Sequence, residues 1–121
     1  MNNILLIDDD QELCALIKKS VLRENIETDC CYSGKDGLIK LKENKYQLVI
    51  LDVMRPGLDG FEILEKIREE YNMPVLMFTA KNDNISKVRG LRAGADDYVT
   101  KPFEMDELTV RIISLIPLHP L

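Results

Sequence analysis

Four apolar runs of this sequence are each followed by polar side chains that could do chemistry. Asp8 and Asp9 come directly after the run NILLI, and Asp52 follows QLVIL. Thr79 follows MPVLMF, and Lys101 lies just beyond DDYVT. Carboxylates, a hydroxyl and an ammonium group would suit the transfer of a phosphoryl group, provided that the fold brings them together.

The three carboxylates are the starting point for that chemistry. Asp8, Asp9 and Asp52 would repel one another without a cation, and Mg²⁺ prefers a few carboxylate oxygens together with water and an incoming phosphate. We predict that Asp52 is the nucleophile and forms an aspartyl phosphate. The Lys101 ammonium would neutralise the developing charge, while the Thr79 hydroxyl would bond a phosphoryl oxygen.

Each of these residues has a plainer structural explanation when it is taken alone. The acidic run from Asp8 to Asp10 could cap a helix, with Asp10 as the best candidate. Thr79 could be an ordinary hydroxyl at a strand end, and Lys101 a solvated surface lysine. These explanations weaken when the residues are considered together, because each stands at the end of its own strand.

The elements that must position these residues alternate between short apolar runs and amphipathic segments. Strands are expected at 3–7, 27–31, 47–51, 73–78 and 96–100, and a last helix at 104–116. The intervening helices have the expected inner positions Leu13, Cys14, Leu16, Ile17 and Val21, then Leu38, Ile39 and Leu41, then Phe61, Leu64, Ile67 and the stem of Arg68, and finally Ile85, Val88 and Leu91.

This alternation predicts an α/β fold with a doubly wound parallel sheet of five strands, covered by helices on both faces. Ser33 and Asp36 have capping-box spacing, Asp59 and Glu62 mark a helix start, Gly94 marks a helix end, and Pro117 ends the last helix. Strands of a parallel sheet end at the same edge, so the polar residues would meet where such sheets bind ligands.

Composition limits the classes of protein that fit. The chain has 121 residues and a net charge of −5, so it is not expected to grip DNA by itself. No membrane span or signal peptide is evident, and a cytoplasmic location is expected. The three cysteines favour reduced thiols that pack as small apolar groups, and His119 is given no role.

The motifs resemble the receiver domain of bacterial two-component response regulators over essentially the whole chain, 1–121. The resemblance rests on LLIDDD with Asp8 and Asp9, LDVMRPGLDG with Asp52, FTA with Thr79, and GADDYVTKPF with Tyr98 and Lys101. It implies a flavodoxin-like (βα)5 fold with strand order 2-1-3-4-5. It also implies Mg²⁺ held by Asp9, Asp52 and the Met54 backbone carbonyl, with Asp8 acting through water, and a sensor histidine kinase as phosphoryl donor.

The resemblance further implies a switch. Phosphate would draw the Thr79 hydroxyl inward and Tyr98 would rotate into the vacated space, while a cis bond before Pro102 would aim Lys101 into the site. Without the resemblance, Tyr98 is equally an amphipathic edge residue whose hydroxyl lies in water.

The surface that responds would comprise the fourth helix, fifth strand and fifth helix. SKVRGLRAGADDY and DELTVRI resemble the subclass that carries a winged-helix DNA-binding domain and forms homodimers through this face. The implied intersubunit pairs are Lys87 with Glu107 and Asp97 with Arg111, around Leu91. The same charges could also be an ordinary solvated helix face.

Several alternatives stay open at this point. Any C-terminal DNA-binding effector domain is expected to lie outside this chain, and a stand-alone receiver that acts by protein contact is the second possibility. An aspartyl-phosphate phosphohydrolase would need a second Asp as general acid where Met54 stands. A scaffold with a degenerate site conflicts with the complete residue set. Arg55 stands where the subclass usually has Leu, which would alter kinase recognition.

Overall fold

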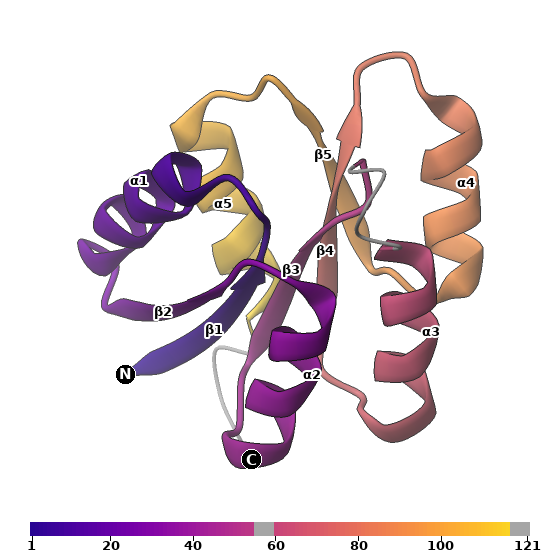
Figure 1. Ribbon diagram of the computed structural model, residues 1–121. Coiled ribbons are helices and arrows are strands. Elements are labelled where there is room, and N and C mark those ends of the chain that lie inside the picture. Colours follow the sequence, from indigo (N-terminus) through magenta and orange to yellow (C-terminus); the bar gives the residue numbers. More distant parts are fainter. Residues whose placement is uncertain (55–59, 117–121) are drawn as a thin grey trace.

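The computed structural model describes residues 1–54 and 60–116 and consists of alternating strands and helices (Figure 1). The elements are β1 (Asn2–Ile7), α1 (Gln11–Leu22), β2 (Ile26–Cys31), α2 (Gly34–Glu43), β3 (Leu48–Asp52), α3 (Gly60–Glu70), β4 (Val75–Ala80), α4 (Asn84–Ala93), β5 (Asp97–Lys101) and α5 (Met105–Leu115). The predicted roles of Arg55, Asp59 and Pro117 fall outside the described residues.

All neighbouring strands are parallel, and their order is β2-β1-β3-β4-β5. The predicted doubly wound sheet and its strand order are therefore confirmed. Two strands extend one residue beyond the sequence expectation, so that Asp52 is the last residue of β3 and Lys101 the last of β5. Within the described residues, no helix is both long enough and apolar enough to cross a membrane.

Helices cover both faces of the sheet. α1 and α5 lie on one face, and α2, α3 and α4 lie on the other (Figure 1). Successive residues of β1 point to opposite faces, so Ile4 and Leu6 pack under α1 and α5, whereas Leu5 and Ile7 pack under α2 and α3. Two apolar cores result, one on each side of the sheet.

Local signals at the helix ends agree with the sequence. The side chain of Ser33 accepts a hydrogen bond from the Asp36 backbone N–H (3.1 Å), which confirms it as the N-cap of α2. Asp10 and Asp83 cap α1 and α4 in the same way. Gly94 ends α4 with φ of +115°, a conformation that glycine adopts without steric cost.

The prediction of which residues form the inner face of α4 is wrong. Ile85, Val88 and Leu91 are exposed, and Gly90 is the buried residue of this helix. The reason is a close approach to the sheet, because a Cβ at Gly90 would overlap the sulfur of Met77. The apolar positions of α4 are therefore rotated away from the sheet.

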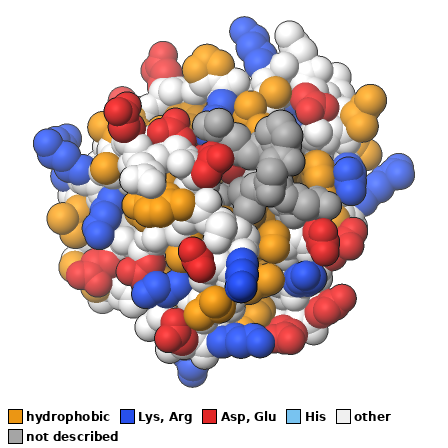
Figure 2. Space-filling model, viewed as in Figure 1, with side chains coloured by type: hydrophobic (Ala, Val, Ile, Leu, Met, Phe, Trp, Pro, Cys, Tyr) orange, Lys and Arg blue, Asp and Glu red, His pale blue; other side chains and the backbone are white. Residues whose placement is uncertain are grey.

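Leu16 of α1 and Ile39 of α2 are also exposed, although both were expected in the core. Each of these helices meets the sheet through a narrower stripe than the sequence pattern suggested. Over the face shown in Figure 2, acidic and basic side chains are interspersed with exposed hydrophobic side chains. On α3, the predicted inner positions Phe61, Leu64 and Ile67 are buried.

Arg68 does more than pack its stem. Its guanidinium donates hydrogen bonds to the backbone carbonyls of Gly94 (2.8 Å) and Met73 (2.7 Å) and forms an ion pair with Asp96 (2.8 Å). The same Asp96 oxygen accepts from the Val75 N–H (2.8 Å). The Arg68 side chain therefore links the loop before β4 to the loop before β5.

We expect Arg68→Ala to lower the free energy of unfolding by about 2 kcal/mol, because it leaves half-buried carbonyls and a carboxylate without their charged donor. Urea unfolding followed by circular dichroism measures this loss. Lys66→Ala is the matched control, since the Lys66 side chain is 52% exposed and forms an i,i+4 pair with Glu62 on the surface of α3. Equal stability of the two variants would contradict the role given to Arg68.

Candidate functional site

The polar strand-end residues meet at the carboxyl edge of the sheet. One carboxylate oxygen from each of Asp8, Asp9 and Asp52 lies within 4.8 Å of the others. Asp8 and Asp52 are fully buried and Asp9 is exposed. Strands β1 and β3 are direct neighbours, and this adjacency brings together carboxylates that are 43 or 44 positions apart in the sequence.

Lys101 is the counter-charge of this cluster. Its ammonium lies 2.7 Å from Asp8 Oδ2 and 3.2 Å from Asp52 Oδ2. The bond between Lys101 and Pro102 is cis, as the sequence resemblance implied. Burial alone would lower the pKa of Lys101, but the hydrogen bond from Lys101 to Asp8 and the charges of both carboxylates raise it, so the side chain is held as a cation.

Asp52 ends the central strand β3 in a buried position. Its Oδ1 accepts a hydrogen bond from the Met54 backbone N–H (2.8 Å). Burial raises the pKa of the Asp52 carboxyl, the Met54 N–H and the Lys101 charge oppose that rise, and Asp8 adds to it. An anionic Asp52 therefore depends on nearby positive charge, which makes it sensitive to any ion or group that binds there.

The residues of the acidic run from Asp8 to Asp10 have different roles. The Asp10 side chain accepts from the Leu13 N–H (3.0 Å) and caps α1, as the structural explanation predicted for this residue. Asp8 instead points into the cluster, where its Oδ1 accepts from the Asp10 N–H (2.9 Å) and its Oδ2 from Lys101. Asp10 thus serves the helix, whereas Asp8 and Asp9 belong to the acidic cluster.

Thr79 of β4 lies at the same edge. Its hydroxyl is buried and has no hydrogen-bond partner among the residues that the structure describes. A buried hydroxyl without a partner is costly, so a ligand oxygen that accepts its hydrogen would be favoured. Tyr98 of β5 is partly exposed, and the Lys87 ammonium lies 5.1 Å from the centre of its ring.

The donor set fits Mg²⁺. Three carboxylates share a small space beside the Lys101 ammonium, and hard oxygen donors together with water are what this ion prefers. The acidic cluster could therefore hold a divalent cation next to Asp52. The predicted contribution of the Met54 carbonyl and the water-mediated role of Asp8 stay predictions.

The surface proposed for dimerisation contains ion pairs within a single chain. Arg111 Nη1 lies 2.8 Å from Asp97 Oδ2, and Arg111 Nε lies 3.4 Å from Glu107 Oε1. Leu91 is exposed on α4. The sequence did not anticipate the internal pair of Asp97 with Arg111, and the pairing of these residues with a second chain stays a prediction.

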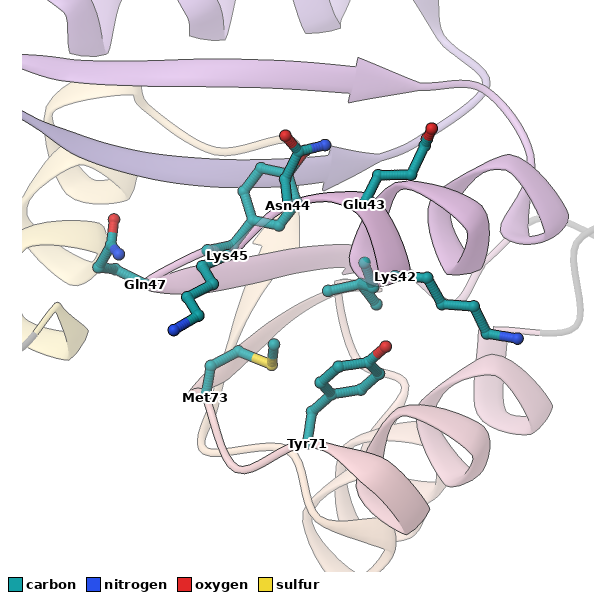
Figure 3. A pocket seen from close by; sticks show the side chains of 9 residues that line it. Lys42, Glu43, Asn44, Lys45, Gln47, Tyr71 and Met73 are labelled. Carbon is teal, nitrogen blue, oxygen red and sulfur yellow. The ribbon is translucent and has the colours of Figure 1, made fainter.

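A pocket of about 680 Å³ lies away from the acidic cluster, around the end of α2, the loop before β3 and the loop before β4 (Figure 3). Lys42, Lys45, Tyr71 and Met73 are among its lining residues. This hollow lies at the amino-terminal ends of the strands, so it is separate from the acidic cluster at their carboxyl ends.

The sequence of residues 4–113 matches the family described as the response regulator receiver domain. The chain belongs to this family. Over 120 residues it is 42% identical to the response regulator ArlR of Staphylococcus haemolyticus and, equally, to ArlR of Staphylococcus aureus. The alignment covers 99% of this chain and 55% of each relative, so the receiver domain spans about half the length of these curated relatives.

Solved structures agree with this assignment. The receiver domain of Francisella response regulator 1452 has a TM-score of 0.87 and 35% identity, with 95% of this chain and 96% of that chain covered. A two-component response regulator from Clostridium difficile has a TM-score of 0.89 and 29% identity, with 95% of each chain covered. The receiver fold predicted from the sequence is confirmed, and this chain is a receiver domain of a two-component system.

Proposed function

We propose that this receiver domain is a switch operated by phosphorylation of Asp52 with Mg²⁺ as the metal. The observation that carries the proposal is the convergence of Asp8, Asp9, Asp52 and Lys101 at one edge of the sheet. The Thr79 hydroxyl, which has no hydrogen-bond partner among the described residues, supports it, since an incoming phosphoryl oxygen would supply an acceptor. The donor is a sensor histidine kinase, as the family membership suggests.

The transfer is a nucleophilic displacement at phosphorus. A carboxylate oxygen of Asp52 attacks the phosphorus, the bond from phosphorus to the donor imidazole nitrogen breaks, and that nitrogen keeps the electron pair. Lys101 already contacts Asp52 Oδ2, so its ammonium can move onto a phosphoryl oxygen with little displacement. Bound Mg²⁺ would supply neutralisation of the charge on the phosphoryl oxygens.

The output is a change in the surface made by α4, β5 and α5. The Thr79 hydroxyl would turn toward the phosphoryl group and Tyr98 would move inward, which alters the face that contains Lys87, Leu91 and Asp97. A homodimer through this face is the proposed consequence. In a longer protein of the length of the ArlR relatives, dimerisation would control an effector domain that binds DNA.

The experiment that tests the function is the intact mass of the protein after incubation with Mg²⁺ and acetyl phosphate. We expect one added phosphoryl group that hydroxylamine removes, because an acyl phosphate is labile to this nucleophile. If no group is added, beryllofluoride is the second probe. A beryllofluoride-induced shift from monomer to dimer would support the switch. The absence of both the phosphoryl adduct and the dimer shift would reject it.

Mg²⁺ should also stabilise the unphosphorylated domain. At ten times its dissociation constant it is expected to raise the free energy of unfolding by about 1.4 kcal/mol, because it binds only the folded site. Urea unfolding with and without Mg²⁺ measures this. Asp9→Ala should abolish the gain, since Asp9 is the exposed carboxylate of the cluster. Asp36→Ala, which removes an exposed carboxylate from α2, is the matched control and should retain the stabilisation by Mg²⁺.

A further inference from the structure

Two thiols lie together between α1 and β2, on the face of the sheet that α1 and α5 cover. Cys14 is on α1 and Cys30 on β2, and the two elements are adjacent (Figure 1). The Cys30 Sγ lies 3.8 Å from the backbone oxygen of Cys14 and donates to it. Both cysteines are free, and both contribute to the same apolar cluster.

The two thiols differ in access to solvent. Cys14 is fully buried, and its Sγ lies 3.4 Å from the backbone oxygen of Asp8, whereas Cys30 is only partly buried. A soluble oxidant would therefore reach Cys30 first. Cys14 would be the nearest thiol to resolve the oxidised product, and its burial protects it from direct attack.

Cys31 offers an internal comparison. It follows Cys30 in β2, so its side chain points to the opposite face of the sheet, where it packs with Leu5 and Ile7. It is 5% exposed. The fold therefore separates adjacent cysteines by the thickness of the sheet and pairs Cys30 with a residue 16 positions away.

We propose that Cys14 and Cys30 form a peroxide-reactive dithiol that closes reversibly to an intramolecular disulfide. The oxidant is a hydroperoxide, which the cell must supply. Disulfides in reducing compartments are usually transient and redox-sensing, and this pair has the arrangement that such a role needs: one partly exposed cysteine and one buried partner. The proposal concerns the covalent state of the thiols and does not depend on phosphorylation of Asp52.

The chemistry proceeds in two balanced steps. The Cys30 thiolate attacks one peroxide oxygen, the O–O bond breaks, and hydroxide leaves as Cys30 becomes a sulfenic acid. The Cys14 sulfur then attacks the Cys30 sulfur, the S–O bond breaks, and water leaves as the S–S bond forms. Two thiols lose two electrons in total, and hydrogen peroxide is reduced to two molecules of water.

Local electrostatics favour Cys30 as the first nucleophile. Hydrogen bonding with Cys14 lowers the pKa of Cys30 to about 7, burial opposes that shift, and the nearby charge of Lys18 assists it. A substantial thiolate fraction at neutral pH is what reaction with peroxide requires.

The test is oxidation of the folded, reduced chain with hydrogen peroxide, followed by denaturation, alkylation with iodoacetamide and mass spectrometry. We expect the number of alkylatable thiols to fall from three to one, with Cys31 remaining, and dithiothreitol to restore all three. Digestion with trypsin should give a cross-link between the peptides of residues 1–18 and 24–35. Because Cys30 and Cys31 share the second peptide, Cys31→Ala assigns the bond.

Cys31→Ala should form the cross-link at the wild-type rate. Cys14→Ala should instead accumulate a sulfenic acid on Cys30 that dimedone traps. Three wild-type results would overturn the proposal: three alkylatable thiols after peroxide, oxidation of Cys30 with Cys14 still alkylatable, or a disulfide that joins two chains. These results come from the natural sequence, so they decide the question even if Cys14→Ala fails to fold.

Discussion

Asp52→Asn is expected to abolish phosphoryl addition from acetyl phosphate and Mg²⁺ while leaving the fold intact. The variant loses the nucleophilic oxygen, and an amide cannot form an acyl phosphate. Asn has nearly the same shape as Asp: its carbonyl oxygen can accept the Met54 N–H as Asp52 Oδ1 does, while its amide group replaces Oδ2, the acceptor of the Lys101 ammonium. The loss of reactivity should therefore be complete without a loss of packing.

The stability of this variant has a definite sign. Burial raises the pKa of Asp52 in the folded state, so the protonated carboxyl contributes favourably to the free energy of unfolding. This contribution is fully present below the pKa that Asp52 has in the unfolded chain, and it is lost as the pH rises through the folded-state pKa. Above the folded-state pKa of Asp52, and without Mg²⁺, the ionised carboxylate is a cost to the fold. Asp52→Asn is expected to melt at the wild-type temperature or above it, and the difference should shrink toward acidic pH.

Intact mass and thermal melting measure these two effects on the same sample. Asp36→Asn, an exposed change of the same chemistry on α2, is the control and should accept one phosphoryl group. Phosphoryl addition to Asp52→Asn at the wild-type level would assign the modification to another residue. A much lower melting temperature would show that the Asp52 charge stabilises the resting site.

Lys101→Ala is expected to have a large effect on both stability and switching. It removes the ammonium from two fully buried carboxylates, Asp8 and Asp52, and breaking a buried ion pair by removal of one partner typically costs about 3 kcal/mol. We expect that loss in urea unfolding without Mg²⁺. Added Mg²⁺ should recover part of it, because the acidic cluster then has another source of positive charge.

The switching effect of Lys101→Ala is separable from its stability effect. The variant should still bind Mg²⁺, but phosphorylation or beryllofluoride should no longer shift it toward a dimer in light scattering. Lys45→Ala is the matched control, since that exposed lysine lies at the opposite edge of the sheet. A normal dimer shift in Lys101→Ala would contradict its role in coupling the site to the surface of α4, β5 and α5.

The sequence was sufficient for the fold because its apolar runs are short and the residues between them are periodic. It also located the site, because parallel strands deliver their last residues to the same edge. Asp8, Asp52, Thr79 and Lys101 could therefore be placed together from strand ends alone. The convergence of β1, β3, β4 and β5 confirms that placement.

Periodicity could not reveal which apolar stripes would stay uncovered. On α4 the burial of Gly90 against Met77 turns Ile85 and Val88 outward, and a pattern of apolar residues contains no information about such a close approach. The bonds of Arg68 were equally hidden, because its acceptors are backbone carbonyls and their positions depend on two loops. Contacts between elements, and between side chains and the backbone, could be seen only in the structure.

The order of the strands has a consequence for the protein during synthesis. The acidic residues of the site are translated early, at positions 8, 9 and 52, but their neutralising ammonium comes last, at position 101 at the end of β5. A chain still on the ribosome with β5 inside the exit tunnel has an acidic cluster without Lys101. The site is complete only after the final strand joins the sheet, because Lys101 is the last residue of β5.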